Sequence, residues 1–142
     1  MGKINTGKVV LGGLVAGLVF NILDFVNNAF IMKEDFAANA TRLGLDPAAS
    51  ETPAGIATWV VIDFLIGILV VWTYAGIRPR FGPGPKTAVL AGLVPFLSIS
   101  LILYGLTSMG MMTSALFWKA TAIQVIFVVI GSVAGAAVYK EE

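Results

Sequence analysis

The sequence predicts an all-α membrane protein, an antiparallel four-helix transmembrane bundle in a single domain. Its 142 residues are 58% hydrophobic and 12% charged, and the mean hydropathy is +0.92, whereas soluble domains carry about 25% charged residues. A helix needs roughly 20 apolar residues to cross a membrane. Four stretches meet that length, at about residues 9–32, 54–77, 87–107 and 113–139. Any activity must therefore be built from the helices and one sizeable loop.

The loop after the first span predicts a short amphipathic helix over residues 35–44. Phe36, Ala40 and Leu43 share one helical face there, and Gly44 is a C-terminal stop signal. Thr52 is then a good N-cap, with Pro53 at the first helical position. We expect the second span to begin at this pair.

The other two connections are shorter. Residues 78–86 contain three bases and three prolines, which predicts a stiff hairpin, and the bases Arg78, Arg80 and Lys86 are expected to contact lipid headgroups. The connection around residues 108–113 is short and apolar, which predicts a tight turn. The expected partners are therefore membrane lipids; the bases need no nucleic acid to explain them.

The distribution of charge predicts the orientation of the bundle. Bases gather at both ends of the chain and in the second loop, at Lys3, Lys8, Arg78, Arg80, Lys86 and Lys140. The first loop instead mixes two bases with four acids, between Lys33 and Glu51. Because short basic segments stay in the cytoplasm, both termini and the second loop are predicted to be cytoplasmic.

The chain contains no cysteine and no histidine. A cysteine-held metal, a thiolate nucleophile and the usual imidazole ligands of haem, zinc or copper are therefore excluded. We expect no cofactor, no metal site and no catalytic residue. A membrane enzyme that uses Asp24 and Asp63 as acid and base stays open as the less favoured alternative.

Two carboxylates stand out because they lie inside apolar spans. Asp24 is in the first span and Asp63 in the second. A charge at such a depth costs at least about 2.5–3.5 kcal/mol, faces protein or trapped water, and marks a candidate functional site. Counted at 1.5 Å per residue from the external ends, both lie roughly 10–12 Å deep. They occupy the external half of the bundle, together with Lys119 and Gln124.

The helical stripes predict which polar residues meet. Gly13, Gly17, Asn21, Asp24 and Asn28 follow one stripe of the first span, and Gly135, Gly131 and Gln124 follow one stripe of the fourth. Small residues allow these two helices to pack tightly at one end and to diverge around polar groups at the other. The predicted ligand- or ion-binding set is Asp24, Asp63, Lys119, Asn21, Asn28, Gln124, Tyr104 and Ser100.

The role of this cluster has two interpretations. Asp63 and Lys119 can form an ion pair, with asparagines bonding Asp24, which would only fix helix register. Alternatively, two acids against one lysine leave a surplus negative charge, which a proton, a cation or a basic ligand neutralises. Lys119 can also extend to the external surface, which would favour the second interpretation.

The segment Gly67-Ile-Leu-Val-Val-Trp-Thr-Tyr-Ala-Gly-Ile-Arg-Pro-Arg-Phe-Gly-Pro-Gly-Pro-Lys-Thr-Ala-Val-Leu-Ala-Gly92 resembles a stretch of small, uncharacterised bacterial membrane proteins with four predicted spans. The resemblance covers about a fifth of the chain. It implies a multi-pass protein of the bacterial inner (cytoplasmic) membrane and brings no site residues.

The leading hypothesis is a small integral membrane protein that binds or conducts a proton, a small cation or a small polar ligand at the carboxylates. Because four helices rarely enclose a full pathway, a homo-oligomer is an accompanying expectation. The alternative is a non-enzymatic accessory or scaffold subunit of a larger membrane complex.

Overall fold

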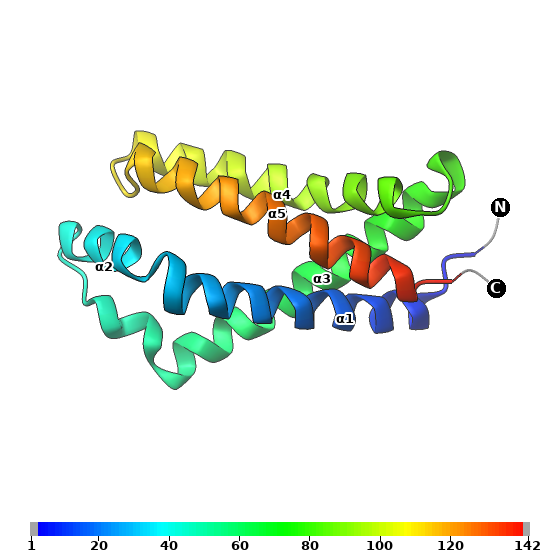
Figure 1. Cartoon of the computed structure of the whole chain (residues 1–142), viewed down its shortest axis with the longest axis horizontal. Helices are drawn as coiled ribbons and strands as arrows, with labels where there is room; N and C mark the ends of the chain where they lie inside the picture. Colours follow the sequence, from blue (N-terminus) through cyan, green and yellow to red (C-terminus); the bar gives the residue numbers. More distant parts are fainter. Residues whose placement is uncertain (1–2, 141–142) are drawn as a thin grey trace.

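The protein is an elongated bundle of four long helices with a short helix at one end (Figure 1). This computed structural model describes residues 3–140. A π-helical turn, η1, extends the first helix, and a 3-10 turn, η2, precedes the third. The elements in chain order are α1 Thr6–Val26, η1 Asn27–Ile31, α2 Lys33–Arg42, η2 Pro47–Glu51, α3 Pro53–Phe81, α4 Pro85–Ser108 and α5 Ser114–Val138.

Four of the helical segments are long and apolar enough to span a membrane. α1 with η1 has 26 residues, α3 has 29, α4 has 24 and α5 has 25, against a requirement of about 20. The all-helical class and the four predicted spans are thereby confirmed. The chain has the make-up of a multi-pass membrane protein.

Three of the long helices, α1, α3 and α5, begin where capping side chains satisfy free backbone N–H groups. The backbone N–H of Gly55 donates to Thr52 Oγ1 at 3.2 Å, and Pro53 occupies the first turn. The predicted start of the second span is confirmed. α5 begins in the same way, since the Leu116 N–H donates to Thr113 Oγ1 at 3.2 Å.

The predicted hairpin over residues 78–86 is wrong in extent. α3 continues through Pro79 to Phe81, and α4 already begins at Pro85, so only residues 82–84 connect them. Pro79 lies in the last turn of α3, and the helix ends instead at Gly82, whose φ of +81° breaks the helical path. The link is a three-residue turn.

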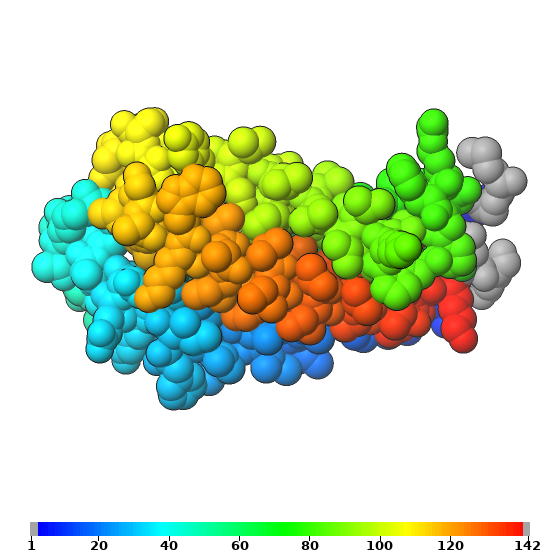
Figure 2. Space-filling view, turned by 45° about the horizontal axis from the view of Figure 1, so that its top comes forward, coloured from blue at the N-terminus to red at the C-terminus, as the bar shows by residue number. Residues whose placement is uncertain are grey.

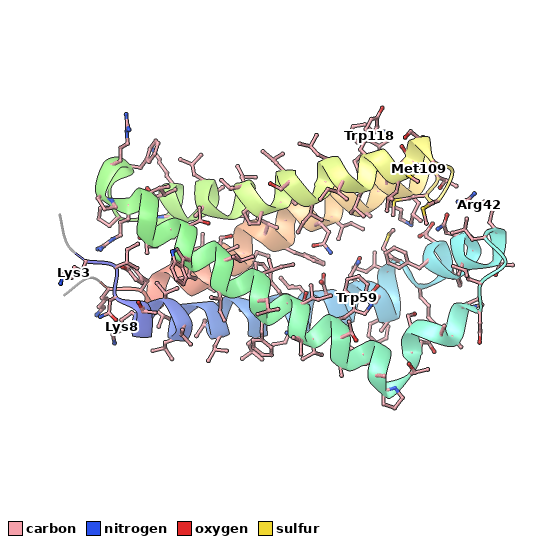
Figure 3. All side chains as sticks on the ribbon, turned by 180° about the vertical axis from the view of Figure 1, so that it is seen from behind. Lys3, Lys8, Arg42, Trp59, Met109 and Trp118 are labelled. Atoms are coloured by element: carbon pink, nitrogen blue, oxygen red, sulfur yellow. The ribbon has the colours of Figure 1, made fainter. Side chains whose placement is uncertain are left out.

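The helices form a four-membered ring. α1 packs against α3 and α5, and α4 packs against the same two helices. The first and last described residues share one end, the terminal end, with the α3–α4 turn (Figure 1). The opposite end, the α2 end, holds α2 and the α4–α5 turn (Figure 2). Lys3 and Lys8 therefore lie far from Arg42 and Met109 (Figure 3).

Glycines allow α1 to touch α3 and α5 backbone to backbone. A Cβ added to Gly67 of α3 would collide with the backbone of Gly13 and Gly17. On the neighbouring side of α1, a Cβ added to Gly12 would lie 2.7 Å from the Gly135 carbonyl oxygen of α5. The predicted close approach of the first and fourth spans is present, through Gly12. Gly13 and Gly17, which share a stripe with Asp24, face α3 instead.

Candidate functional site

The structure brings the carboxyl groups of Asp24 and Asp63 together. Each side chain is a hydrogen-bond partner of the other. Asp63 is buried, with 6% of its surface exposed, and Asp24 is half-buried. The pair joins α1 to α3, because a Cβ at Gly17 would lie 2.7 Å from Phe64 Cα, directly beside Asp63. The glycine contact thus sets the distance across which the two acids face each other.

Gln124 completes the pair from α5. Its side-chain amide donates a hydrogen bond of 2.9 Å to Asp24 Oδ1. The residues are 100 positions apart in the chain, and the bond spans the α1–α5 interface that Gly12 and Gly135 form nearer the terminal end. Three helices therefore converge on the Asp24 and Asp63 carboxyls, which we call the carboxyl pair.

Asn21 and Asn28 flank the carboxyl pair without donating to it. The Asn21 amide donates to the carbonyl oxygens of Gly17, at 2.8 Å, and of Val60, at 3.3 Å, so it ties α1 to α3. The Asn28 amide donates to the Asp24 carbonyl oxygen at 2.8 Å, within its own helix. Their amides support the backbone around the pair, and the carboxyl oxygens stay available to other donors.

Asn27 is a site residue that the helical stripe did not single out. It is 2% exposed, and its Oδ1 has no hydrogen-bond partner in the described part of the chain. It opens the π-helical turn η1, one turn beyond Asp24. Buried amide oxygens nearly always accept a hydrogen bond or contact an ion or water, and π-turns recur at functional sites. Within residues 3–140, Asn27 is therefore a buried, unpaired hard oxygen donor one helical turn from Asp24.

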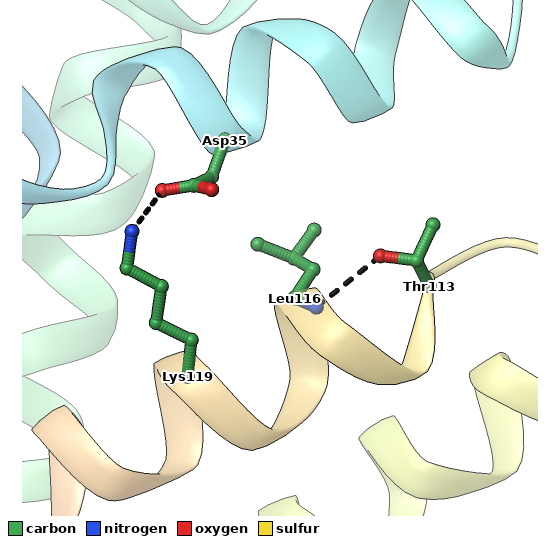
Figure 4. Close-up of polar contacts among 4 residues, drawn as sticks. All are labelled: Asp35, Thr113, Leu116 and Lys119. Carbon is green, nitrogen blue, oxygen red and sulfur yellow. Dashed lines mark hydrogen bonds and ion pairs between the residues drawn. The ribbon is translucent and has the colours of Figure 1, made fainter.

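Lys119 lies elsewhere than predicted. Its ammonium group donates to Asp35 Oδ2 of α2 at 2.6 Å (Figure 4). The two side chains are 50% and 37% exposed. The expected ion pair of Lys119 with Asp63 is therefore wrong. α2 packs at this end of the bundle and places the Asp35 carboxylate beside Lys119. Lys119 binds α2 to α5 and leaves the charge of the carboxyl pair without this counter-ion.

Tyr104 and Ser100 also lie outside the carboxyl pair. Tyr104 is 55% exposed, and its ring packs on Phe117 with centroids 5.4 Å apart. Neither side chain has a hydrogen bond to Asp24 or Asp63 among residues 3–140. The main neighbours of α4 are α3 and α5 rather than α1, which carries Asp24.

The three predicted lipid-contact bases lie at the terminal end. Arg80 and Lys86 are exposed on either side of the turn 82–84. The Arg78 guanidinium lies 5.8 Å from the centroid of the Tyr139 ring, a cation–π contact. Arg78 is half-buried, whereas the exposed position of Arg80 and Lys86 agrees with the predicted role, which remains a prediction.

Comparisons with protein-family models, with curated proteins and with solved structures yield no match for this chain. The resemblance of residues 67–92 to bacterial four-span proteins stays an expectation.

The chemistry of the carboxyl pair follows from its composition. Two carboxylates in contact repel each other unless a proton or a cation lies between them. No third acidic, histidine or cysteine ligand joins them in the part of the chain that the structure describes. The oxygen donors that the structure brings together are thus the two carboxyl groups. Such hard oxygen ligands suit a proton or an alkali cation better than a transition metal.

Proposed function

We propose that this protein is a small integral membrane protein that binds or conducts a proton or small cation at the Asp24–Asp63 carboxyl pair. The observation that carries the proposal is the contact of two carboxyl groups within apolar helices, with Lys119 engaged by Asp35. An ionisable side chain inside a membrane span is costly to insert, and such residues are generally retained for function. The backbone contact of α1 and α3 beside the pair favours an occupant of atomic size over a larger polar ligand.

The proposed orientation places the terminal end in the cytoplasm. Lys3 and Lys8 lie at that end (Figure 3), which also holds Arg80 and Lys86 around the α3–α4 turn. The positive-inside rule then supports cytoplasmic termini and an external position for α2. In this orientation the carboxyl pair would lie in the external half of the bundle. A bacterial inner membrane and a homo-oligomer complete the proposal.

Carbodiimide labelling tests the proposal. Dicyclohexylcarbodiimide modifies protonated carboxyl groups in apolar surroundings, and peptide mass spectrometry locates the adduct. We expect labelling at Asp63 or Asp24 that Na⁺ or K⁺ suppresses if the occupant is a cation. Acid pH would increase it if the occupant is a proton. Asp63→Asn should remove the Asp63 adduct, and Asp46→Asn, in the exposed loop, should change nothing.

A measurement of stability separates binding from a purely structural pair. A bound cation stabilises the folded protein in proportion to the logarithm of its concentration. The melting temperature of the wild type should therefore rise with one alkali cation relative to choline, and that rise should vanish in Asp24→Asn and Asp63→Asn. No labelling at either aspartate, and no effect of pH or cation on stability, would contradict the proposal and favour an accessory subunit.

A further inference from the structure

A second feature lies at the opposite end from the carboxyl pair, between α4 and α5. It is a pocket of about 130 Å³ that opens on the bundle surface. One side is formed by Tyr74, Pro85 and Ala88, and the other by Val133, Ala136 and Ala137. The volume has room for a segment of a hydrocarbon chain. It is far too small for a peptide helix.

The pocket walls are apolar. Three of the lining side chains are alanine, and the hydroxyl of Tyr74 is already engaged, because the Gly84 N–H donates to it at 3.1 Å. The same bond fixes the α3–α4 turn at the pocket edge. An occupant would therefore meet mainly hydrocarbon, as expected of a site for an apolar chain.

The pocket floor is held rigidly. The Tyr74 ring meets the Tyr139 ring edge to face, with centroids 5.9 Å apart. Both tyrosines are buried, at 4% and 3% exposed. Thr87 secures the first turn of α4, since its hydroxyl donates to the Gly82 carbonyl oxygen at 2.7 Å. The pocket is thus formed before any ligand enters.

Two exposed bases lie close in the chain to the pocket residues Gly84 and Pro85. Lys86 follows the lining residue Pro85, and Arg80 lies on the last turn of α3, both exposed. The sequence contains no acidic residue between Phe64 and Lys140. Apolar walls below basic side chains at a helix-bundle surface match the two parts of an anionic lipid, its acyl chain and its phosphate.

We propose that this pocket is a specific site for an anionic phospholipid. One acyl chain packs between α4 and α5 against Ala88 and Ala137, and the phosphate lies at Lys86 and Arg80. The complementarity of charge selects an anionic over a zwitterionic headgroup, and the preformed apolar walls distinguish the site from general headgroup contact along the surface. The proposal stands on the terminal end of the bundle and is independent of what the carboxyl pair binds.

Native mass spectrometry of the delipidated protein tests the site. We expect phosphatidylglycerol to bind more tightly than phosphatidylcholine of the same chains. Each base near an anionic headgroup contributes ~1 kcal/mol, about fivefold, so Arg80→Gln with Lys86→Gln should weaken phosphatidylglycerol binding roughly 25-fold. Lys33→Gln, at the α2 end, is the matched control and should bind as the wild type does.

A second pair of variants tests the pocket itself. Ala137→Trp fills it from an exposed position, so the bundle core stays intact, and it should abolish the tight phosphatidylglycerol complex. Ala122→Trp adds the same bulk to an exposed α5 position outside the pocket and should retain it. Equal affinity for the two lipids in the wild type, or undiminished phosphatidylglycerol binding in Ala137→Trp, would overturn the proposal.

Discussion

The side-chain amide of Gln124 donates a 2.9 Å hydrogen bond to Asp24, and so joins α5 to the carboxyl pair of α1 and α3. The bond crosses between helices and involves a carboxyl group inside the bundle. It therefore couples the geometry of the pair to the packing of α5.

Loss of the Gln124 bond should destabilise the fold measurably. In Gln124→Leu the Asp24 oxygen loses its donor, and hydrogen bonds to charged groups contribute about 1.5–3 kcal/mol. We expect a loss of that size in the free energy of unfolding, measured by denaturant titration in micelles. Ser98→Ala, which removes only a bond to Val94 of the same helix, should cost less than about 1 kcal/mol. Equal losses in the two variants would show that the Gln124 bond contributes no more to stability than a hydrogen bond within one helix.

The ion pair of Lys119 and Asp35 should contribute little to stability despite its 2.6 Å length. Both side chains are substantially exposed, and exposed pairs are worth about 0.2–1 kcal/mol. A double-mutant cycle with Lys119→Gln and Asp35→Asn should give a coupling energy below about 1 kcal/mol that falls with added salt. Because Lys119 does not neutralise the carboxyl pair, Lys119→Gln should leave the cation dependence of melting unchanged. If the cation dependence of melting disappeared in Lys119→Gln, Lys119 would have to contribute to the binding site.

Sequence periodicity predicted the parts of this structure that local physics decides. An apolar helix with few polar residues must bury or pair them, so the stripes of Asp24, Asp63 and Gln124 indicated which groups would meet. The cap at Thr52 followed equally from local rules. These signals needed no knowledge of how the helices neighbour one another.

The errors came from long-range packing. A stripe gives the face of a helix but not the neighbour that covers it, so the sequence could not show that Tyr104 packs on Phe117 of α5 and stays largely exposed. The partner of Lys119 depends on where α2 packs, and the hydrophobic periodicity of the sequence carries no information on that position. Asn27 was left out of the predicted set because it lies three residues after Asp24, beside the stripe that continues at Asn28, and the sequence does not show which helix buries it.

Ser132 offers a test of polar burial in α5. It is fully buried, its Oγ has no hydrogen-bond partner within residues 3–140, and it faces Gly92 of α4 so closely that a Cβ there would strike Oγ. Removing an unsatisfied hydroxyl is nearly neutral or stabilising. We expect Ser132→Ala to unfold at the same or a higher denaturant concentration. Ser132→Val, which adds bulk against Gly92, should cost about 1–3 kcal/mol; a marked loss in Ser132→Ala would reveal a hydrogen bond that the hydroxyl makes.

Gly67 should be the most sensitive glycine of α3. An added Cβ would collide with the backbone of Gly13 and lie 2.5 Å from the Gly17 nitrogen, neither of which can move without displacing α1. We expect Gly67→Ala to lose about 3 kcal/mol of unfolding free energy, the upper end for overpacking. Gly76→Ala is the matched control in the same helix, because its Cβ would have no neighbour within 4 Å. Gly76→Ala gains the same helix propensity as Gly67→Ala, up to about 1 kcal/mol, without a steric clash.

The comparison of Gly67→Ala with Gly76→Ala also tests the geometry of the carboxyl pair. A displaced α1 would widen the distance between Asp24 and Asp63, so Gly67→Ala should weaken the cation or pH dependence of carbodiimide labelling, whereas Gly76→Ala should retain it. Labelling by peptide mass spectrometry and unfolding in denaturant can be measured on the same two preparations. If Gly67→Ala and Gly76→Ala were equally stable and equally labelled, the α1–α3 backbone contact could not be what sets the geometry of the pair.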